Sequence, residues 1–156
     1  MKIESSIDIS KPPSEVFAFM TSDENLPLWI SNLIRSERMF GDDATKGAIT
    51  NLFYDENGKR EVLEEEVLEV EENKSIKAIL KHNRTNILVN YRLESLDEDN
   101  TRLYSEYEYQ PNSLLFKVYL SLNRGNLTER YQNDLQQLKN AIESLSDEFD
   151  ELEDED

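Results

Sequence analysis

Carboxylates crowd one short segment of the chain, Glu61–Val70, and are the side chains whose type and spacing could do chemistry. Because a strand alternates its faces, one register turns Glu64 and Glu66 toward the interior. The other register turns Glu65 and Glu69 inward, so either register places carboxylates on the concave face unless a β-bulge intervenes. A buried carboxylate is costly unless it is paired or protonated, so an inward one is a candidate general acid, general base or ligand anchor. We select Glu64 and Glu66; the alternative is a strand that twists outward at the sheet edge, with its glutamates solvated.

Aromatic side chains with polar tips form a second candidate set. On the segment Arg102–Tyr109, alternation places Leu103, Ser105, Tyr107 and Tyr109 on one face. Apolar bodies with polar tips suit a ligand pocket better than a dry core. The pocket walls that we predict, from this strand and from other elements, are Trp29, Phe53, Tyr91, Ser105, Tyr107, Tyr109, Phe116 and Tyr119. Plain core packing is the alternative for any one of them.

No catalytic or metal-binding motif accompanies these residues. The single histidine, His82, precedes Asn83-Arg84-Thr85 in a predicted hairpin turn, so we interpret it as a solvated turn residue. Cysteine is absent, and the carboxylates lack the spacing of a calcium-binding loop. There is no glycine-rich phosphate loop and no Gly-x-Ser-x-Gly elbow. We therefore predict no catalytic residue, no metal and no cofactor.

Seven strands must position the candidate residues. Alternation of apolar and polar residues predicts the first strand over Lys2–Ser10. Six more follow, approximately Leu33–Phe40, Ala48–Asp55, Arg60–Val70, Ser75–Lys81, Asn86–Leu96 and Arg102–Tyr109. The dipeptide Asn57-Gly58 readily takes the positive φ of a tight hairpin. Neighbouring strands usually pair, which favours a meander.

Helices occupy the two remaining parts of the chain. Pro12-Pro13 and Asp23 mark the starts of two short helices after the first strand. A long C-terminal helix is indicated by Leu127, Tyr131, Leu135, Leu138, Ile142 and Leu145, spaced by three or four residues. An apolar run precedes this stripe, and Gly125 between them predicts a bend.

The order strand, two helices, six strands, helix predicts an α+β protein with a curved seven-stranded antiparallel sheet. The stripe of the last helix is the large apolar surface left to cover the concave face, so the helix should lie in the grip of the sheet around an internal cavity. This helix-grip domain should span residues 1–146. The segment 147–156 holds eight acidic residues and no basic ones, which predicts a disordered acidic tail.

Charge and composition exclude several classes of partner. The chain has 34 acidic and 17 basic side chains and a formal charge of −17, which opposes binding to nucleic acid and to anionic lipid. No apolar run approaches the roughly 18 residues of a membrane span, and no basic-plus-apolar leader is present. The lack of cysteine fits a reducing cytoplasm, where we expect the protein to act as a monomer or weak dimer.

Four stretches also resemble a known superfamily: Ile7–Met20 (IDISKPPSEVFAFM), Asn25–Trp29 (NLPLW), Thr101–Tyr109 (TRLYSEYEY) and Leu138–Glu143 (LKNAIE). They are similar to the START-related, pollen-allergen-like superfamily, also written SRPBCC, in its polyketide cyclase/dehydrase-like branch. The resemblance implies the helix-grip fold. Members include lipid carriers, hormone receptors, cyclases and chaperone regulators, so fold alone selects no function.

Three functional hypotheses follow. The first is non-catalytic binding or carriage of a small, mostly hydrophobic or amphipathic molecule in the cavity. The second is a polyketide cyclase/dehydratase-like enzyme acting on a poly-oxo or aromatic substrate, with Glu64 or Glu66 as general acid/base and Tyr107 as hydrogen-bond donor. The third is a chaperone-regulator-like interaction module that meets a basic partner through its acidic surface and tail.

Overall fold

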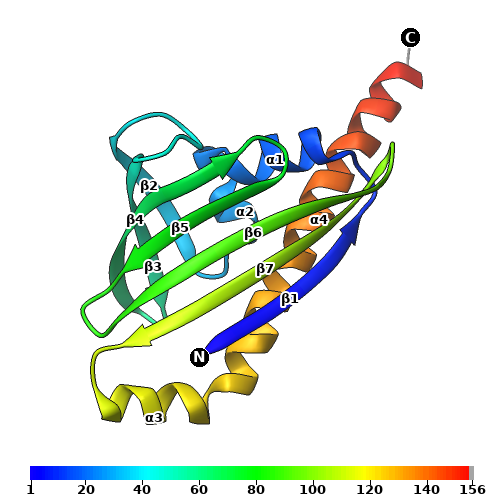
Figure 1. The fold of residues 1–156 in the computed structure, drawn as a ribbon. Helices are drawn as coiled ribbons and strands as arrows, with labels where there is room; N and C mark the ends of the chain where they lie inside the picture. The colour runs from blue at the N-terminus through cyan, green and yellow to red at the C-terminus, as the bar shows by residue number, and fades with distance from the viewer. Residues whose placement is uncertain (155–156) are drawn as a thin grey trace.

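Seven strands form one antiparallel sheet in the computed structural model of the protein, which describes the backbone of residues 1–154 and the side chains of residues 1–145 (Figure 1). They are β1 (Lys2–Ile9), β2 (Leu33–Phe40), β3 (Ile49–Glu56), β4 (Lys59–Glu71), β5 (Ser75–Lys81), β6 (Thr85–Asp97) and β7 (Asn100–Pro111). Their order across the sheet is β1-β7-β6-β5-β4-β3-β2, so β2 to β7 form a meander and β1 joins the edge at β7. The predicted topology is confirmed.

Helices cover the concave face and one end of this sheet (Figure 1). They are α1 (Pro13–Thr21), the 3-10 turn η1 (Asp23–Asn25), α2 (Leu26–Trp29), α3 (Leu114–Leu122) and α4 (Arg124–Asp154). The predicted α+β helix-grip architecture is confirmed, with α4 as the long helix. The most deeply buried part of the hydrophobic core is formed by side chains of β1, α1, β7 and α4. Those exposed by at most 2% include Ile3, Ile9, Val16, Leu103, Leu135 and Leu138.

Polar side chains of α4 bind the free backbone edge of β1. Arg124 donates to the carbonyl of Lys2 at 3.1 Å, and Gln132 donates to the carbonyl of Ser6 at 3.1 Å. Lys139 donates to the carbonyl of Asp8 at 2.7 Å. An open sheet edge is a site for unwanted strand pairing. These side chains therefore protect the edge and fix α4 along its length.

One feature of the backbone differs from expectation, and a second settles a point that the sequence left open. The helix is interrupted at Asn123, whose backbone N–H bonds the carbonyls of Tyr119 and Leu120, and the predicted bend at Gly125 falls inside α4 instead. On β4, the pairing with β5 shifts between Val67 and Glu69, which is a bulge. The predicted hairpin at Asn57-Gly58 is present, with φ of 54° and 82°.

The expected boundary between a domain ending at 146 and an acidic tail over 147–156 falls where side chains lie outside the described residues. It stays a prediction. Within the described part of the chain, no helix combines the length and apolarity that crossing a membrane requires.

Candidate functional site

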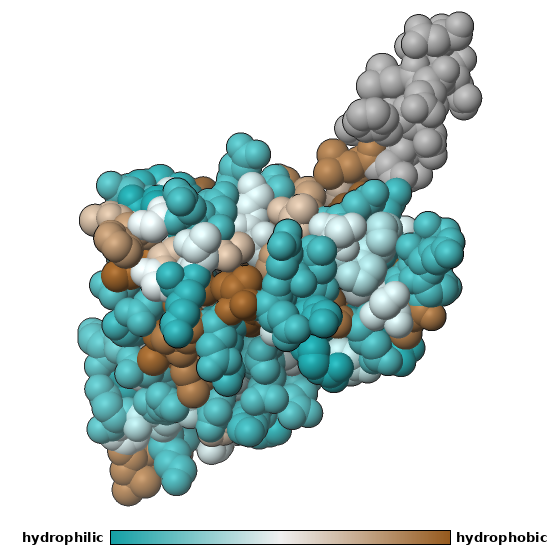
Figure 2. All heavy atoms as spheres, turned by 45° about the horizontal axis from the view of Figure 1, so that its top comes forward, coloured by the Kyte–Doolittle hydropathy of each residue, from teal (hydrophilic) through white to brown (hydrophobic). Residues whose placement is uncertain are grey.

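A pocket of about 550 Å³ lies between the concave face of the sheet and the helices. Its walls come from the six strands β2 to β7, from α1 and α2, and from α3 and α4. Strand alternation explains the apolar part: on β5, for example, Ile76, Ala78 and Leu80 all face the pocket. The face of the molecule in Figure 2 is, by contrast, mainly hydrophilic, with hydrophobic residues in smaller patches.

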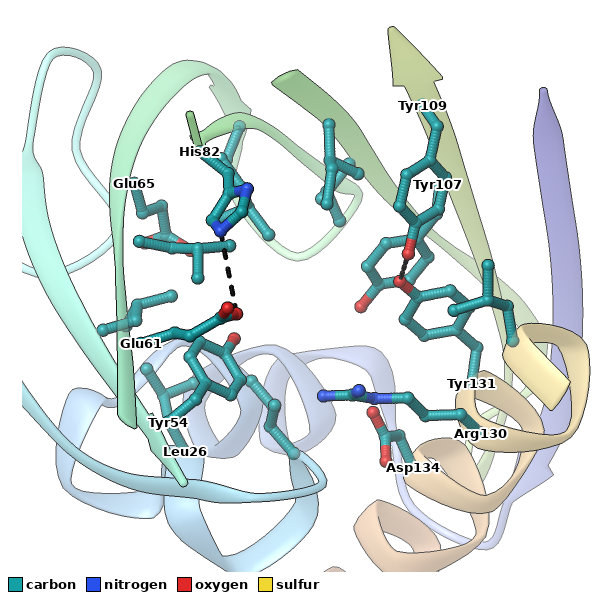
Figure 3. Close-up of a pocket in the computed structure, with 18 of the residues that line it drawn as sticks. Leu26, Tyr54, Glu61, Glu65, His82, Tyr107, Tyr109, Arg130, Tyr131 and Asp134 are labelled. Carbon is teal, nitrogen blue, oxygen red and sulfur yellow. Dashed lines mark hydrogen bonds and ion pairs between the residues drawn. The ribbon is translucent and has the colours of Figure 1, made fainter. Parts of the chain in front are cut away.

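An aromatic wall lines one side of the pocket. Trp29 meets Tyr91 edge-on with ring centroids 5.9 Å apart, and Tyr91 meets Tyr107 edge-on at 6.1 Å. Tyr107 stacks on Tyr131 of α4 with centroids 3.7 Å apart. The hydroxyl of Tyr91 pairs with that of Tyr107. The hydroxyl of Tyr109 pairs with that of Tyr131 (Figure 3). Burial raises the pKa of Tyr91, Tyr107 and Tyr131, so these phenols stay protonated and can donate hydrogen bonds.

Glu65 stands across the pocket from these tyrosines (Figure 3). Burial raises the pKa of its carboxyl to about 7, the carboxylate of Asp23 adds to the rise, and Arg38 opposes it. Arg38 also pairs with Asp23 at 2.6 Å. A carboxyl with this pKa exchanges its proton near neutral pH, so Glu65 can act as an acid, a base or a hydrogen-bond donor.

His82 and Glu61 face each other on the same side, with 3.7 Å between the imidazole Nε2 and the carboxylate (Figure 3). The Nδ1 atom of His82 accepts from the backbone N–H of Arg84 at 3.2 Å. The prediction of a solvated turn residue is wrong, because the side chain of His82 is only 18% exposed and lines the pocket. The β5–β6 turn therefore contributes to the pocket wall, through His82 and Arg84.

A polar cluster on α4 closes another side of the pocket. Asp134 is 3% exposed and accepts hydrogen bonds from the backbone N–H of Ser31, at 3.1 Å, and from the Ser31 hydroxyl. Arg130, one helical turn earlier, binds the Glu56 carboxylate at 2.6 Å and the Ser31 carbonyl at 3.1 Å. Burial raises the pKa of Asp134, and the bonds from Ser31 oppose the rise. Both side chains line the pocket; Asp134 is held by Ser31 in the α2–β2 loop, and Arg130 is held by Ser31 and by Glu56 of β3.

The pocket brings together six of the ten residues selected from sequence. They are Trp29, Tyr91, Tyr107, Tyr109, Phe116 and Tyr119. Phe116 and Tyr119 come from α3 and stack with centroids 5.5 Å apart. Their contact with a ligand stays a prediction.

Three of the other residues lie on the outer face of the sheet, so their predicted inward orientation is wrong. Glu64 and Glu66 approach the ammonium of Lys81 at 3.6 and 3.7 Å. Phe53 lies under the guanidinium of Arg35, 3.7 Å from the ring centroid. The register turns the other residues of each strand inward, and on β4 it is Glu65 that enters the pocket.

Ser105 is on the inner face but outside the pocket lining. It is 3% exposed and pairs across the sheet with Ser5 of β1. Neither hydroxyl has a hydrogen-bond partner among the described residues. The predicted place of Ser105 in the pocket wall is wrong, because β7 runs on beyond the pocket.

Four polar residues that line the pocket were not selected from the sequence: Glu65, His82, Arg130 and Asp134. Glu65 belonged to the register that was left as the alternative. Arg130 and Asp134 carried a weaker signal: they adjoin the apolar stripe of the last helix and are four residues apart, which places them on one face. Within the described part of the chain, no three potential metal ligands are grouped.

Comparison with known proteins gives the chain a family and a fold. The sequence profile described as polyketide cyclase / dehydrase and lipid transport matches residues 1–143. No curated protein matches the chain. Among solved structures, a START superfamily protein from Mycobacterium smegmatis has a TM-score of 0.75 at 14% identity, with 92% of this chain and 98% of that chain covered.

Two further structures share the fold. Ara h 8.0201 has a TM-score of 0.72 at 14% identity, with 92% of this chain and 98% of that chain covered. DynU16, a protein of the dynemicin biosynthetic locus, has a TM-score of 0.68 at 14% identity, and 91% of this chain covers 47% of that one. At these identities the likeness shows the fold.

Proposed function

The chain belongs to the polyketide cyclase/dehydrase and lipid transport family, within the START-related, pollen-allergen-like superfamily, and from that premise we propose that it binds a small, largely apolar molecule in its pocket. The observation that carries the proposal is the pocket of about 550 Å³ with its aromatic wall. Ligand pockets in proteins typically measure about 300–1,000 Å³ and combine apolar walls with a few placed polar groups.

The polar groups of the pocket narrow the chemistry of the ligand. Protonated phenols on one side and the Glu65 carboxyl on the other favour a molecule with oxygen atoms on an otherwise apolar, flat body. Ligand oxygens could accept from the hydroxyls of Tyr107 and Tyr131, while the rings stack on the ligand body. We therefore propose an oxygenated aromatic or polycyclic molecule as the ligand class.

Binding can be followed through Trp29, which is the single tryptophan of the chain and lines the pocket. Titration with the fluorescent dye 8-anilinonaphthalene-1-sulfonate, which joins apolar aromatic rings to one sulfonate, should change Trp29 emission saturably, with one dye per chain. Native mass spectrometry of freshly purified protein should show whether a molecule co-purifies. A linear, unsaturable fluorescence response together with a ligand-free mass would contradict the proposal.

Glu65 favours a second candidate function, a cyclase/dehydratase-like reaction. Its carboxylate could remove a proton from the carbon between two carbonyls of a poly-oxo substrate, and the resulting enolate would attack a third carbonyl. The protonated carboxyl would return that proton to the new alkoxide, which gives a hydroxyl group. In the dehydration the carboxylate would remove the second proton of the same carbon and pass it to this hydroxyl, which leaves as water while the carbon–carbon double bond forms. The observation in favour is the pKa of about 7, close to the value that general acid–base catalysis needs.

The test of this second candidate uses acetylacetone in heavy water, with proton exchange followed by NMR. The wild type should accelerate exchange, and Glu65→Gln should reduce the acceleration roughly 100-fold, the lower end of general-base contributions. Glu64→Gln, next to it but on the outer face, should behave as wild type. Equal exchange rates with wild-type and Glu65→Gln protein would remove Glu65 as a base.

Three expectations from sequence stay predictions: a cytoplasmic location, a monomer or weak dimer, and a role as an interaction module. The last depends on the acidic segment 147–156. If that segment holds a basic partner, its deletion should abolish capture of that partner while leaving dye binding intact.

A further inference from the structure

The helix α3 exposes an unusual amount of apolar surface. Leu114 is 78% exposed, Leu115 is 82% exposed and Leu122 is 81% exposed, and Val118 beside them is about half exposed. We call these four residues the α3 apolar face. In Figure 1, α3 stands at one end of the molecule, away from α1 and α2. Contiguous apolar residues on a surface mark an interaction site more often than single ones do.

The opposite side of α3 belongs to the pocket. Leu120 is 3% exposed, and it lines the pocket together with Phe116, Tyr119 and Asn123. This helix therefore has apolar residues on both sides. One side closes the pocket, and the other has no partner among the described residues. Whatever binds the α3 apolar face would sit within one helix diameter of the pocket.

Charge around α3 differs from charge on the rest of the molecule. From Tyr109 to Thr128 there is no acidic residue, although the whole chain carries 34. The same segment holds two cations, Lys117 and Arg124. Lys117 is exposed and makes no ion pair with a described residue. Arg84, in the β5–β6 turn, lines the pocket, and its carbonyl accepts from the N–H of Asn112 just before α3.

A second copy of the chain is a poor occupant of this face. An α-helix of nine residues is roughly 13 Å long, so its exposed side is far smaller than the ~800 Å² per partner of a stable interface. Each copy would also bring a formal charge of −17 toward the other. A bilayer surface needs no such area, because several leucines can enter the acyl region side by side.

We propose that α3 docks the protein on a lipid bilayer of low net charge, with the α3 apolar face inserted below the headgroups. Lys117 and Arg124 would then lie at the level of the lipid phosphates, and the acidic body would remain in water. Docking in this orientation places the part of the pocket wall that α3 forms beside the bilayer. The proposal rests on the exposure and charge of α3, and it stands whether or not the pocket binds the ligand proposed above.

Flotation with phosphatidylcholine vesicles tests the docking. The wild type should float with the vesicles, and Leu114→Ser/Leu115→Ser/Leu122→Ser should lose at least about tenfold in partitioning, since three large apolar side chains leave the bilayer. The matched control is Met39→Ser/Phe40→Ser on β2, which removes two residues that are 56% and 67% exposed elsewhere on the surface. It should float as the wild type does.

Because the α3 leucines are exposed, the triple variant should keep the circular dichroism spectrum and the dye binding of the wild type, which separates docking from pocket function. Vesicles containing phosphatidylserine should bind less at low salt, because the body is acidic, and added salt should reduce the difference. Wild-type protein that stays with the unbound fraction, or a control that loses as much as the triple variant, overturns the proposal. So does a wild-type dimer that the triple variant converts to a monomer without any vesicle binding.

Discussion

Replacing Glu65 with glutamine should stabilise the protein at alkaline pH and leave its stability at acid pH nearly unchanged. The folded pKa of this carboxyl is about 7, whereas its ordinary value is 4.5. The folded state therefore binds a proton more readily than the unfolded chain does. Between these two pH values the wild type must lose stability as pH rises, because folding increasingly requires a buried negative charge or proton uptake.

The size of the effect follows from the shift. Each pKa unit corresponds to about 1.36 kcal/mol, so the wild type should lose about 3 kcal/mol at Glu65 between pH 4.5 and 7. Relative to the wild type, Glu65→Gln should then gain roughly 6–12 °C in melting temperature at pH 8. Thermal unfolding followed by circular dichroism across this pH range measures the difference directly.

The neighbouring carboxylate on the same strand provides the control. Glu64 lies on the outer face beside Lys81, so Glu64→Gln should reproduce the pH profile of the wild type. Asp23 and Asp134 also have raised pKa values and contribute to the profile of all three proteins, which is why the comparison uses differences. If melting temperature depends on pH in the same way for Glu65→Gln and for the wild type, the pKa of Glu65 is not raised on folding. Its proposed role as an acid or base then has no support.

Filling the pocket with Ala78→Trp should abolish dye and ligand binding. Ala78 is 8% exposed and lies on β5 between Val67 and Val89, so a large side chain there enters the pocket. We expect the dissociation constant to rise at least about 100-fold, which corresponds to roughly 2.7 kcal/mol of lost binding free energy. Isothermal titration calorimetry is the suitable measurement, because an added tryptophan complicates the fluorescence signal.

A change on the other side of the same strand separates occlusion from damage to the sheet. Ile79 alternates with Ala78 and faces outward, so Ile79→Trp adds the same ring without entering the pocket. It should bind dye as the wild type does. Over-packing costs about 1–3 kcal/mol, but the space around Ala78 should keep that cost low, so both variants should unfold cooperatively. Undiminished binding by Ala78→Trp would place the ligand outside this pocket.

The fold could be predicted from sequence because the apolar residues of the main strands and of the long helix recur at the period of that element. The alternation of Lys2–Ser10 and the helical stripe from Leu127 to Leu145 each required only a buried face. The meander followed from short polar turns. The sequence placed the helix break at Gly125, because glycine is the residue there that most disfavours a helix. In the structure α3 ends two residues earlier, where the backbone N–H of Asn123 bonds the carbonyls of Tyr119 and Leu120.

The candidate site was only partly predictable, because acidic side chains occupied both faces of β4. Glu64 and Glu65 were equivalent by alternation, and the choice between them depended on pairing with distant strands. The bulge after Val67 also turns Glu69 out again, so only one of the two alternate carboxylates of that register enters the pocket. His82 was misjudged for a similar reason, since a turn can fold over an opening or away from it.

The bonds from α4 to the edge of β1 have a consequence for the rate at which a ligand enters and leaves. Arg124, Gln132 and Lys139 fasten the helix to that strand, so moving α4 aside would break several contacts together. Among the described residues, no hydrogen bond joins α3 to a strand, and its attachment is through apolar side chains such as Leu120. We therefore expect a bound molecule to exchange past α3, with a residence time set by how often that short helix moves away rather than by movement of α4.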